Sequence, residues 1–500
     1  MSLAIIHTRA LLGIGAPRVQ TEVHLANGLP AFTIVGLPET AVKESKDRVR
    51  SAIVNSHFEF PQRRITVNLA PADLPKQSGR YDLAIALGIL VASEQIPATL
   101  IDQYEFIGEL ALTGDLRGVR GAIASAKACV ADNRTLICPI DNQQEAAFCA
   151  PRGSLIASSL LEVAAHLHQR TKLPAPEKLR LPEPSETYPD LADVKGQLQA
   201  RRALEVAASG GHNLLFFGPP GTGKSMLAAR LGGILPPLEN DEALDVAAIQ
   251  SVIGNNQPND WQRRPFRTPH HTASAVALVG GGSNPKPGEI SLAHQGVLFL
   301  DELPEFSRSV LEVMREPLES GRIAISRASA QVEFPAQFQL IAAMNPCPCG
   351  YAGDKTQRCH CTQQQIARYR QKISGPLLDR IDLHVPVTTL PISDLHSRPQ
   401  GESSVMVRQR VIACRAIQQA RQGMANSRLQ GKALQSHCAL DMNGKKLLEQ
   451  AVIRLNMSAR GYDRILRVAR TLADMAGEAS LGANHLGEAL SYRLLDRSEL

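Results

Sequence analysis

The sequence predicts an α/β protein that contains two α/β domains followed by a helical region. Three observations favour this class. Short β-type runs alternate with helical patterns up to about residue 168, the alternation returns over residues 190–395, and residues 396–500 have helical patterns with charged faces. A chain of 500 residues is also too long for one core, because domains usually hold roughly 100–200 residues.

The composition is that of a globular protein. Hydrophobic residues make up 44% and charged residues 20% of the chain, unlike a disordered or fibrous chain. No apolar run approaches the roughly 20 residues that span a bilayer, and the start lacks a basic stretch before a long apolar one. We therefore expect a cytoplasmic protein with no membrane partner. Nine cysteines favour reduced thiols or a metal site over disulfides there, and a net charge of +6 allows a polyanionic partner.

The first domain is predicted over residues 1–168. The run ITVNLA (65–70) is typical of a strand, and DLAIALGILVAS (82–93) is typical of a helix. Residues 169–189 follow as a predicted linker, since they contain TKLPAPEKLRLPEPSETYP, which is rich in proline and charge. The second domain is then expected from residue 190.

A nucleotide-binding loop stands near the start of the second domain. The apolar run LLFF precedes the pattern G-x-x-x-x-G-K-S, and the helical run MLAARLGGIL follows it, which is the context that a P-loop requires. Lys224 is expected to reach the β- and γ-phosphates of ATP, and Ser225 to bind Mg²⁺. The predicted loop residues are Gly218, Pro219, Pro220, Gly221, Thr222, Gly223, Lys224 and Ser225.

Two carboxylates and an amide follow later strands of the same domain. GVLFLDE ends in Asp301, a predicted Mg²⁺ ligand, and Glu302, which is predicted to activate the attacking water. FQLIAAMN ends in Asn345, which either orients that water or closes a turn before Pro346. Because parallel strands end at one sheet edge, these side chains are expected beside the P-loop.

These motifs resemble the AAA+ superfamily, in the branch that contains magnesium-chelatase ATPase subunits and MCM helicases. The resemblance runs from DLADVKGQ through GPPGTGKS, GVLFLDE and AMNP to SGPLLDRIDL. It implies that Arg380 is a finger that enters a neighbouring subunit's ATP site, and that Arg460, in SARGYDRILRVAR, belongs to the sensor-2 helix of a C-terminal lid. Such a site is complete only in a ring. The alternative is that Arg380 pairs locally with Asp379 or Asp382.

Longer segments resemble the YifB/ComM family of bacterial proteins across nearly all of the chain. They are VGLPETAVKESKDRVRSAI, ITVNLAPADLPKQSGRYDLAIALGIL, RPFRTPHHTASAVALVGGG and PGEISLAHQGVLFLDELPEF. The resemblance implies a homo-hexameric ATPase that binds ATP, Mg²⁺ and DNA and drives branch migration, as a helicase, in homologous recombination during natural transformation. Two other functions stay open: a metal-insertion ATPase of the magnesium-chelatase type, and an AAA+ factor that remodels proteins.

The N-terminal domain resembles the proteolytic domain of Lon proteases. PKQSGRYD places Arg80 where the Lon motif has its serine nucleophile, and the later lysine of the Lon dyad falls near Ile123. A serine nucleophile needs an adjacent base. The resemblance therefore implies a catalytically dead domain that serves as a scaffold or as a DNA-contacting collar.

Basic groups lie in two segments that the chelatase/MCM resemblance places in a ring channel, an insertion between the Walker segments and the hairpin ISRASAQVEFPAQ. Phosphate contacts from these groups would tolerate any base sequence, and with aromatic residues at 4% we favour backbone tracking over base stacking. The alternative is that the same groups cap helices or form ion pairs. The candidate DNA contacts are Arg327, Arg267, His270 and His271, which Arg263 and Arg264 could join.

Four cysteines form the pattern CPCGYAGDKTQRCHC. Four thiolates this close can bind tetrahedral zinc, although Cys-x-Cys pairs are tighter than the usual spacing. Bound Zn²⁺ would stiffen the loop before Arg380, whereas the alternative is four reduced thiols, because the fold does not need a metal there. The candidate ligands are Cys347, Cys349, Cys359 and Cys361, with His360 as a spare.

Overall fold

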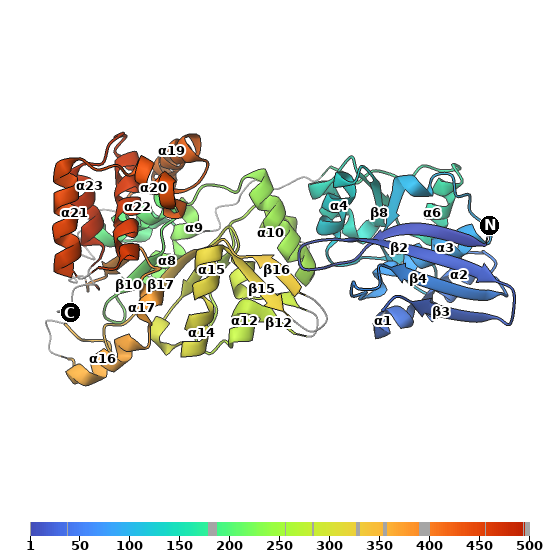
Figure 1. Ribbon diagram of the computed structural model, residues 1–500, viewed down its shortest axis with the longest axis horizontal. Coiled ribbons are helices and arrows are strands. Elements are labelled where there is room, and N and C mark those ends of the chain that lie inside the picture. The colour runs from blue at the N-terminus through green and yellow to red at the C-terminus, as the bar shows by residue number, and fades with distance from the viewer. Residues whose placement is uncertain are drawn as a thin grey trace.

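The computed structural model describes residues 2–37, 39–178, 188–255, 257–282, 285–326, 331–353, 358–389, 401–455, 457–493 and 495. The molecule is elongated, with an N-terminal α/β part at one end and a group of C-terminal helices at the other (Figure 1). Residues 179–187 of the predicted linker and Arg327 lie outside the described residues. Within the described ranges, no helix combines the length and the apolar character that crossing a membrane requires.

The N-terminal part contains a four-stranded sheet of order β1-β2-β4-β3 and a parallel three-stranded sheet of order β5-β8-β9, with a short pair β6-β7. β2 alternates buried and more exposed side chains, as expected of a sheet that covers a core on one face. The strands are β1 (Leu3–Arg9), β2 (Arg18–Ala26), β3 (Ala31–Val35), β4 (Arg64–Ala70), β5 (Tyr104–Phe106), β6 (Glu109–Leu110), β7 (Leu116–Arg117), β8 (Thr135–Pro139) and β9 (Ser154–Ala157).

The helix α3 (Asp82–Ala92) forms the centre of the N-terminal core. Its sequence DLAIALGILVA is apolar on all sides, and every residue of it is buried. A Cβ atom on Gly88 would lie 2.4 Å from a methyl group of Val23, so this glycine lets α3 approach β2 closely. The surrounding helices are α1 (Thr40–Lys43), α2 (Ser45–Asn55), α4 (Ala122–Ala131), α5 (Gln143–Cys149) and α6 (Leu160–Leu167).

The central part contains a five-stranded parallel sheet of order β11-β14-β17-β10-β18, which confirms the predicted parallel sheet. β17 is buried along its whole length because elements cover both faces of the sheet. Two hairpins, β12-β13 and β15-β16, stand beside the sheet. The strands are β10 (Leu214–Phe217), β11 (Phe266–Arg267), β12 (Gly280–Gly281), β13 (Lys286–Pro287), β14 (Val297–Leu300), β15 (Arg322–Ser326), β16 (Gln331–Pro335), β17 (Gln339–Met344) and β18 (Leu383–Pro386).

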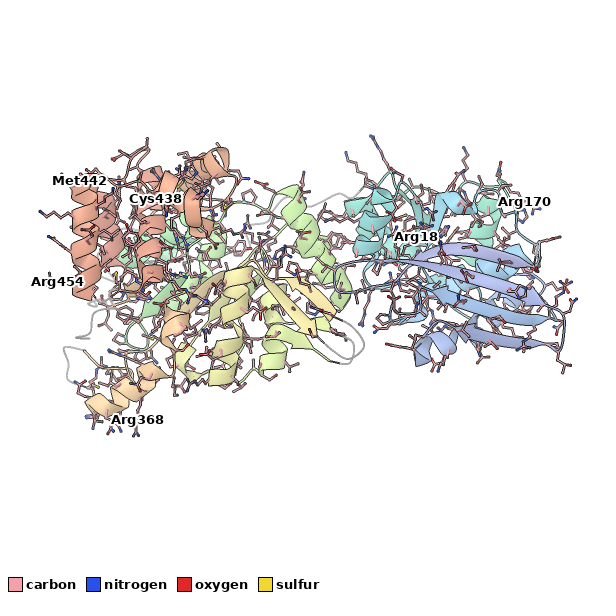
Figure 2. The ribbon with its side chains drawn as sticks, in the orientation of Figure 1. Arg18, Arg170, Arg368, Cys438, Met442 and Arg454 are labelled. Carbon is pink, nitrogen blue, oxygen red and sulfur yellow. The ribbon has the colours of Figure 1, made fainter. Side chains whose placement is uncertain are left out.

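Helices connect the strands of the central sheet. The helix α16 extends from the lower edge of this part, with Arg368 at its tip (Figure 2). The central helices are α7 (Leu198–Gly210), α8 (Lys224–Ala229), α9 (Leu231–Ile234), α10 (Asn240–Ile253), α11 (Pro258–Trp261), α12 (Ala275–Val279), α13 (Glu289–Leu292), α14 (Arg308–Val313), α15 (Arg315–Ser320), α16 (Gln363–Gln371) and α17 (Gly375–Leu378).

The C-terminal part is helical, as predicted. Its most amphipathic helix, α22, buries Ile465, Val468 and Leu472 and packs on α7 and α23, so that the helices share one core with the central sheet. Met442 and Arg454, near the two ends of α21, lie on the outer side of this part (Figure 2). The helices are α19 (Ser404–Gln422), α20 (Gly431–His437), α21 (Met442–Leu455), α22 (Ala459–Met475) and α23 (Ala483–Ser491).

The N-terminal part docks directly on the central part. Ile123 of α4 is buried against Trp261, Ala247 and Ala248, which belong to α10 and α11. The Gly121 N–H group also donates a hydrogen bond of 3.1 Å to the carbonyl of Ser251 at the end of α10. Ile123, near the position of the Lon lysine, is therefore part of an apolar interface.

A second contact joins the N-terminal part to the hairpin β15-β16. The turn between β1 and β2 carries Leu12 and Ile14, which pack against the core under this hairpin. A Cβ atom on Gly13 would lie 2.7 Å from a methyl group of Val332, so the turn and β16 are in close contact.

Candidate active site

The P-loop connects β10 to α8 at the carboxyl edge of the central sheet. Gly221 and Gly223 have φ angles of 77° and 89°, in the left-handed region that glycine adopts without strain. A Cβ atom on Gly218 would lie 2.0 Å from the carbonyl of Val387, so only glycine fits where the loop passes β18. The sequence LLFFGPPGTGKS therefore folds here as the strand, loop and helix start that were predicted.

Lys224 lies over the loop. Its ammonium group donates hydrogen bonds of 2.7 Å and 2.9 Å to the carbonyls of Gly218 and Pro219, and one of 3.1 Å to Oδ1 of Asn345. Burial lowers the pKa of Lys224, and the nearby carboxylates of Asp301 and Glu302 oppose that shift. The ammonium thus lies at the meeting point of the loop and the end of β17.

Ser225 and Asp301 are also in contact. The Ser225 hydroxyl donates a 2.5 Å hydrogen bond to Oδ2 of Asp301, which directly follows β14. A hydroxyl and a carboxylate side by side are the oxygen ligands that Mg²⁺ prefers. These two residues therefore fit the Mg²⁺ site predicted from their motifs.

Glu302 lies beside a histidine. Nδ1 of His271 is 3.1 Å from the carboxylate of Glu302, and the rings of His270 and His271 lie 4.2 Å apart. Glu302 itself has a φ of 53°, a strained conformation for a residue with a side chain that costs on the order of 1 kcal/mol or more. His271, a candidate DNA contact, thus lies at the proposed catalytic carboxylate, a contact that no sequence motif indicated.

Arg380 and Arg460 lie at the opposite edge of the sheet. Arg380 stands before β18, whereas the P-loop follows the parallel neighbour β10. The Arg380 guanidinium donates to the carbonyl of Pro376 at 2.7 Å and to the carboxylate of Glu319. Arg460 is 3.9 Å from the other oxygen of Glu319. The two arginines share one carboxylate, and neither Asp379 nor Asp382 is the ion-pair partner of Arg380 in the described part of the chain.

The four cysteines come together. Their sulfur atoms all lie within 4.8 Å of one another. Sγ of Cys347 is 3.3 Å from that of Cys349 and 3.7 Å from that of Cys359, and the Ala352 N–H group donates to the Cys347 sulfur at 3.2 Å.

The cysteine loop touches the P-loop. A Cβ atom on Gly350 would lie 2.7 Å from Cδ of Pro220 and 3.9 Å from the side chain of Asn345. The cysteine loop therefore packs on the nucleotide site at Gly350.

The remaining basic candidates have partners within the chain. Arg267 donates to Glu289 at 2.6 Å and 2.8 Å, and Arg264 donates to Glu242 at 2.9 Å. The Arg263 guanidinium lies 4.5 Å from the centre of the Tyr188 ring. These contacts correspond to the local ion pairs that were left as the alternative to DNA contacts.

The Lon-like motif has no serine and lysine pair among its described residues. Arg80 is buried and donates a 2.9 Å hydrogen bond to the hydroxyl of Ser125. Lys76 is also buried and donates to the carbonyl of Pro71, whereas Ser78 is exposed. The cations of this motif thus point into the N-terminal core.

Three family matches cover most of the chain. The magnesium chelatase subunit ChlI family matches residues 190–395, a further family described as subunit ChlI of Mg-chelatase matches residues 21–142, and the ChlI C-terminal family matches residues 401–493. The fold and the site therefore define a magnesium-chelatase-like AAA+ protein, a class that implies ATP and Mg²⁺ as cofactors.

Relatives along the full length define the family more narrowly. The chain is 52% identical over 499 residues to YifB of Salmonella typhimurium, covering 99% of this chain and 98% of the relative. It is 50% identical over 504 residues to the competence protein ComM of Haemophilus influenzae, again covering 99% and 98%. A magnesium-chelatase 38 kDa subunit from Cereibacter sphaeroides is 25% identical over 332 residues, 60% of this chain and 90% of the relative. The chain belongs to the YifB/ComM family.

Proposed function

We propose that this protein is an ATP-driven DNA motor of the cytoplasm, a hexameric branch-migration helicase that acts in homologous recombination during natural transformation. The observation that carries the proposal is the position of Arg380 and Arg460. Strands β10 and β18 have four residues each, so the two sheet edges are separated by about 13 Å. Arginines at the far edge are out of reach of phosphates on their own P-loop, and a second copy of the chain would supply them.

The P-loop edge supplies the chemistry of hydrolysis. The loop N–H groups and Lys224 would bind the phosphates, and Ser225 and Asp301 would hold Mg²⁺, which neutralises phosphate charge when bound. Glu302 would accept the proton of the attacking water, and Asn345, which contacts Lys224, would orient that water. Arg380 and Arg460 of a neighbour would stabilise the charge that develops on the γ-phosphate.

The name of a homologous protein supports DNA as the substrate. The relative from Haemophilus influenzae is named a competence protein. The hairpin β15-β16, whose turn would carry Arg327, is the segment that we propose enters the channel of the ring, with Arg267, His270 and His271 as further candidates for phosphate contacts.

We also propose that Cys347, Cys349, Cys359 and Cys361 bind one structural zinc ion. With Zn–S bonds of about 2.3 Å, the sulfurs of a tetrahedral site lie about 3.8 Å apart. The observed separations of 3.3 Å, 3.6 Å and 3.7 Å suit that geometry. The metal would fix the loop that packs on Pro220 and Asn345.

The zinc proposal is tested by metal analysis of protein purified without added metal. About one zinc per chain is expected, and it should be lost in Cys347→Ser and Cys361→Ser. Cys438→Ser is the matched control, because Cys438 lies in the C-terminal helical core. Fully active protein without zinc would remove the proposal.

The motor proposal is tested by the rate of ATP hydrolysis with and without branched DNA. Stimulation by the junction, together with strand exchange that requires ATP, is the expected result, and Glu302→Gln measures any contaminating ATPase. If DNA does not change the ATPase rate, two alternatives remain. A rate that depends on a chelatase partner would identify a metal-insertion ATPase, and a rate that depends on a protein substrate would identify a protein-remodelling factor.

A further inference from the structure

A large cavity lies at the amino edge of the central sheet, between the sheet and the C-terminal helices. Its volume is about 1260 Å³, and its lining includes Arg264, Arg415, Arg428, Glu239 and Glu242. This end of the cavity lies beside α10 and α19 and has its own set of charges. The Arg380, Arg460 and Glu319 group, which we assign to a neighbour's ATP, lines the same cavity but has its ion pairs among its own members.

The charges at the α10 and α19 end do not balance. Arg264 uses its guanidinium fully, with hydrogen bonds to the carbonyls of Pro236 and Gln295 and an ion pair of 2.9 Å with Glu242. The carboxylate of Glu242 is thereby paired with Arg264. Two further guanidinium groups, those of Arg415 and Arg428, also line this end of the cavity.

Neither of these two arginines has a carboxylate partner within the described residues. Arg415 donates through Nε to the carbonyl of Ala208 at 3.0 Å. Its two terminal nitrogens stay available to donate to a ligand. Burial, together with the positive charges of Arg264 and Arg428, lowers the pKa of Arg415 to about 10. Arg428 is exposed to the solvent of the cavity. Two guanidinium groups that line one cavity without a carboxylate partner of their own favour the binding of an anion there.

A hydroxyl completes the group. A Cβ atom on Gly211 would lie 3.0 Å from the hydroxyl oxygen of Ser427, and 3.1 Å and 3.3 Å from the terminal nitrogens of Arg415. Ser427 and Arg415 thus pack side by side against Gly211, and they line the same cavity as Arg428. Guanidinium groups and a hydroxyl that face one cavity are the donors that bind phosphate oxygens with charge-assisted hydrogen bonds.

We propose that Arg415, Arg428 and Ser427 form a second phosphate-binding site, separate from the P-loop. The group it binds is a phosphate with at least one negative charge, from a free phosphate or nucleotide, or from the backbone of a nucleic acid. The site lies in the lid and not in the nucleotide loop, so its existence does not depend on the motor function proposed above.

The test is a calorimetric titration with inorganic pyrophosphate, in the absence of nucleotide, of the full-length protein carrying Lys224→Ala, which weakens phosphate binding at the P-loop. Saturable binding is expected for this parent protein. Arg415→Ala and Arg428→Ala should each weaken it roughly tenfold or more, because each removes a charge-assisted hydrogen bond, and Ser427→Ala should weaken it less. The matched control is Lys432→Ala, since Lys432 is exposed four residues beyond Arg428 and does not line the cavity.

Two results overturn the proposal: no saturable binding by the parent protein, or equal affinities when Arg415→Ala, Arg428→Ala and Lys432→Ala are each added to it. Circular dichroism is used to check that each variant is folded. If an arginine variant does not fold, the affinity of Ser427→Ala for pyrophosphate still tests the site. A single-stranded oligonucleotide without a terminal phosphate then identifies the source. Displacement of pyrophosphate by it assigns the site to a nucleic-acid backbone, and no displacement assigns it to a free phosphate or nucleotide.

Discussion

The two edges of the central sheet carry opposite kinds of polar group. At the carboxyl edge, Ser225 touches Asp301 and Lys224 touches Asn345, so most of the groups that a nucleotide needs are already in contact. At the amino edge, arginines gather around few carboxylates, as Arg380 and Arg460 do around Glu319. The carboxyl edge holds the groups that bind a nucleotide, and the amino edge holds arginines that share one carboxylate. This difference supports the proposal that a complete ATP site forms between two chains.

The largest effect is expected for Arg380→Ala. If the finger acts between subunits, removal of its charge should lower ATP hydrolysis roughly 10³-fold or more. Mixing Arg380→Ala with Lys224→Ala should restore part of the activity, because some interfaces then combine an intact P-loop with an intact finger. The measurement is the ATPase rate of the mixture, with subunit exchange checked by differently tagged chains.

A titration of wild type with Arg380→Ala is the companion experiment. If the ATPase rate falls more steeply than linearly with the fraction of mutant chains, the sites are coupled in a ring. Strictly linear loss, together with a mixture that exchanges subunits and stays inactive, would place Arg380 in the site of its own chain and break the comparison.

The next effect concerns Glu302→Gln. The amide keeps the shape of the side chain but cannot accept the proton of water, so turnover should fall by about 10²–10⁴-fold while ATP binding persists. Lys224→Ala should instead weaken binding itself. The measurement is the affinity for a fluorescent ATP analogue beside the steady-state rate, and equal losses of both in Glu302→Gln would show that the assigned role is wrong.

Asp382 tests whether charge at the amino edge also holds the fold together. It is buried, accepts from the Asn213 N–H group at 3.0 Å and pairs with Arg464 at 2.5 Å. Burial alone would raise the pKa of Asp382, but Arg464 and His212 hold it well below its usual range. Asp382→Asn should lower the free energy of unfolding at pH 7 by about 3 kcal/mol, since the mostly buried Arg464 loses its charge partner.

The pH dependence of this effect has a definite sign. Because the pKa of Asp382 is lower in the folded state, its contribution to stability is present above its unfolded pKa of about 3.9 and is lost as the pH falls below it. The free energies of unfolding of wild type and Asp382→Asn, measured with urea, should therefore become more similar below about pH 4. Asp379→Asn is the control, with an expected change within about 0.5 kcal/mol. A difference that does not change with pH would contradict the assignment.

The smallest effect is expected for His271→Ala. Its contact with Glu302 resembles a partly exposed ion pair worth about 0.2–1 kcal/mol. If His271 restrains Glu302, its removal should raise the DNA-independent ATPase rate by at most about fivefold. His270→Ala is the control, because His270 stacks on His271 without being the partner of Glu302. A lower rate would show that the histidine assists the carboxylate.

The carboxyl edge could be predicted residue by residue from the sequence. Asp301 and Asn345 stand directly after apolar strands, and Lys224 and Ser225 follow the loop after another. Parallel strands bring their ends together. Ser225, Asp301, Lys224 and Asn345 are accordingly in contact. The parallel sheet and the C-terminal helices followed from the same periodic patterns.

The amino edge could not be predicted in this way. The partner of Arg380 is Glu319, on a helix 61 residues away, and not an aspartate next to it in sequence. Arg415 and Arg428 line one cavity only because α19 and the segment after it pack near the amino edge of the sheet. The sequence also did not indicate the partners of His271 and Arg267, two candidate DNA contacts that lie against carboxylates of their own chain.

The docking of the N-terminal part bears on how modular the protein is. A proline-rich connection usually joins bodies that can be separated, but here Ile123 covers Trp261, and the turn at Gly13 covers Val332 of the hairpin β15-β16. Cutting the chain after residue 168 would leave both apolar surfaces open to water. A displacement of the hairpin would likewise be felt at β1 and β2, since their turn rests on it. The N-terminal domain is therefore packed as an integral part of the protein rather than as a separable module.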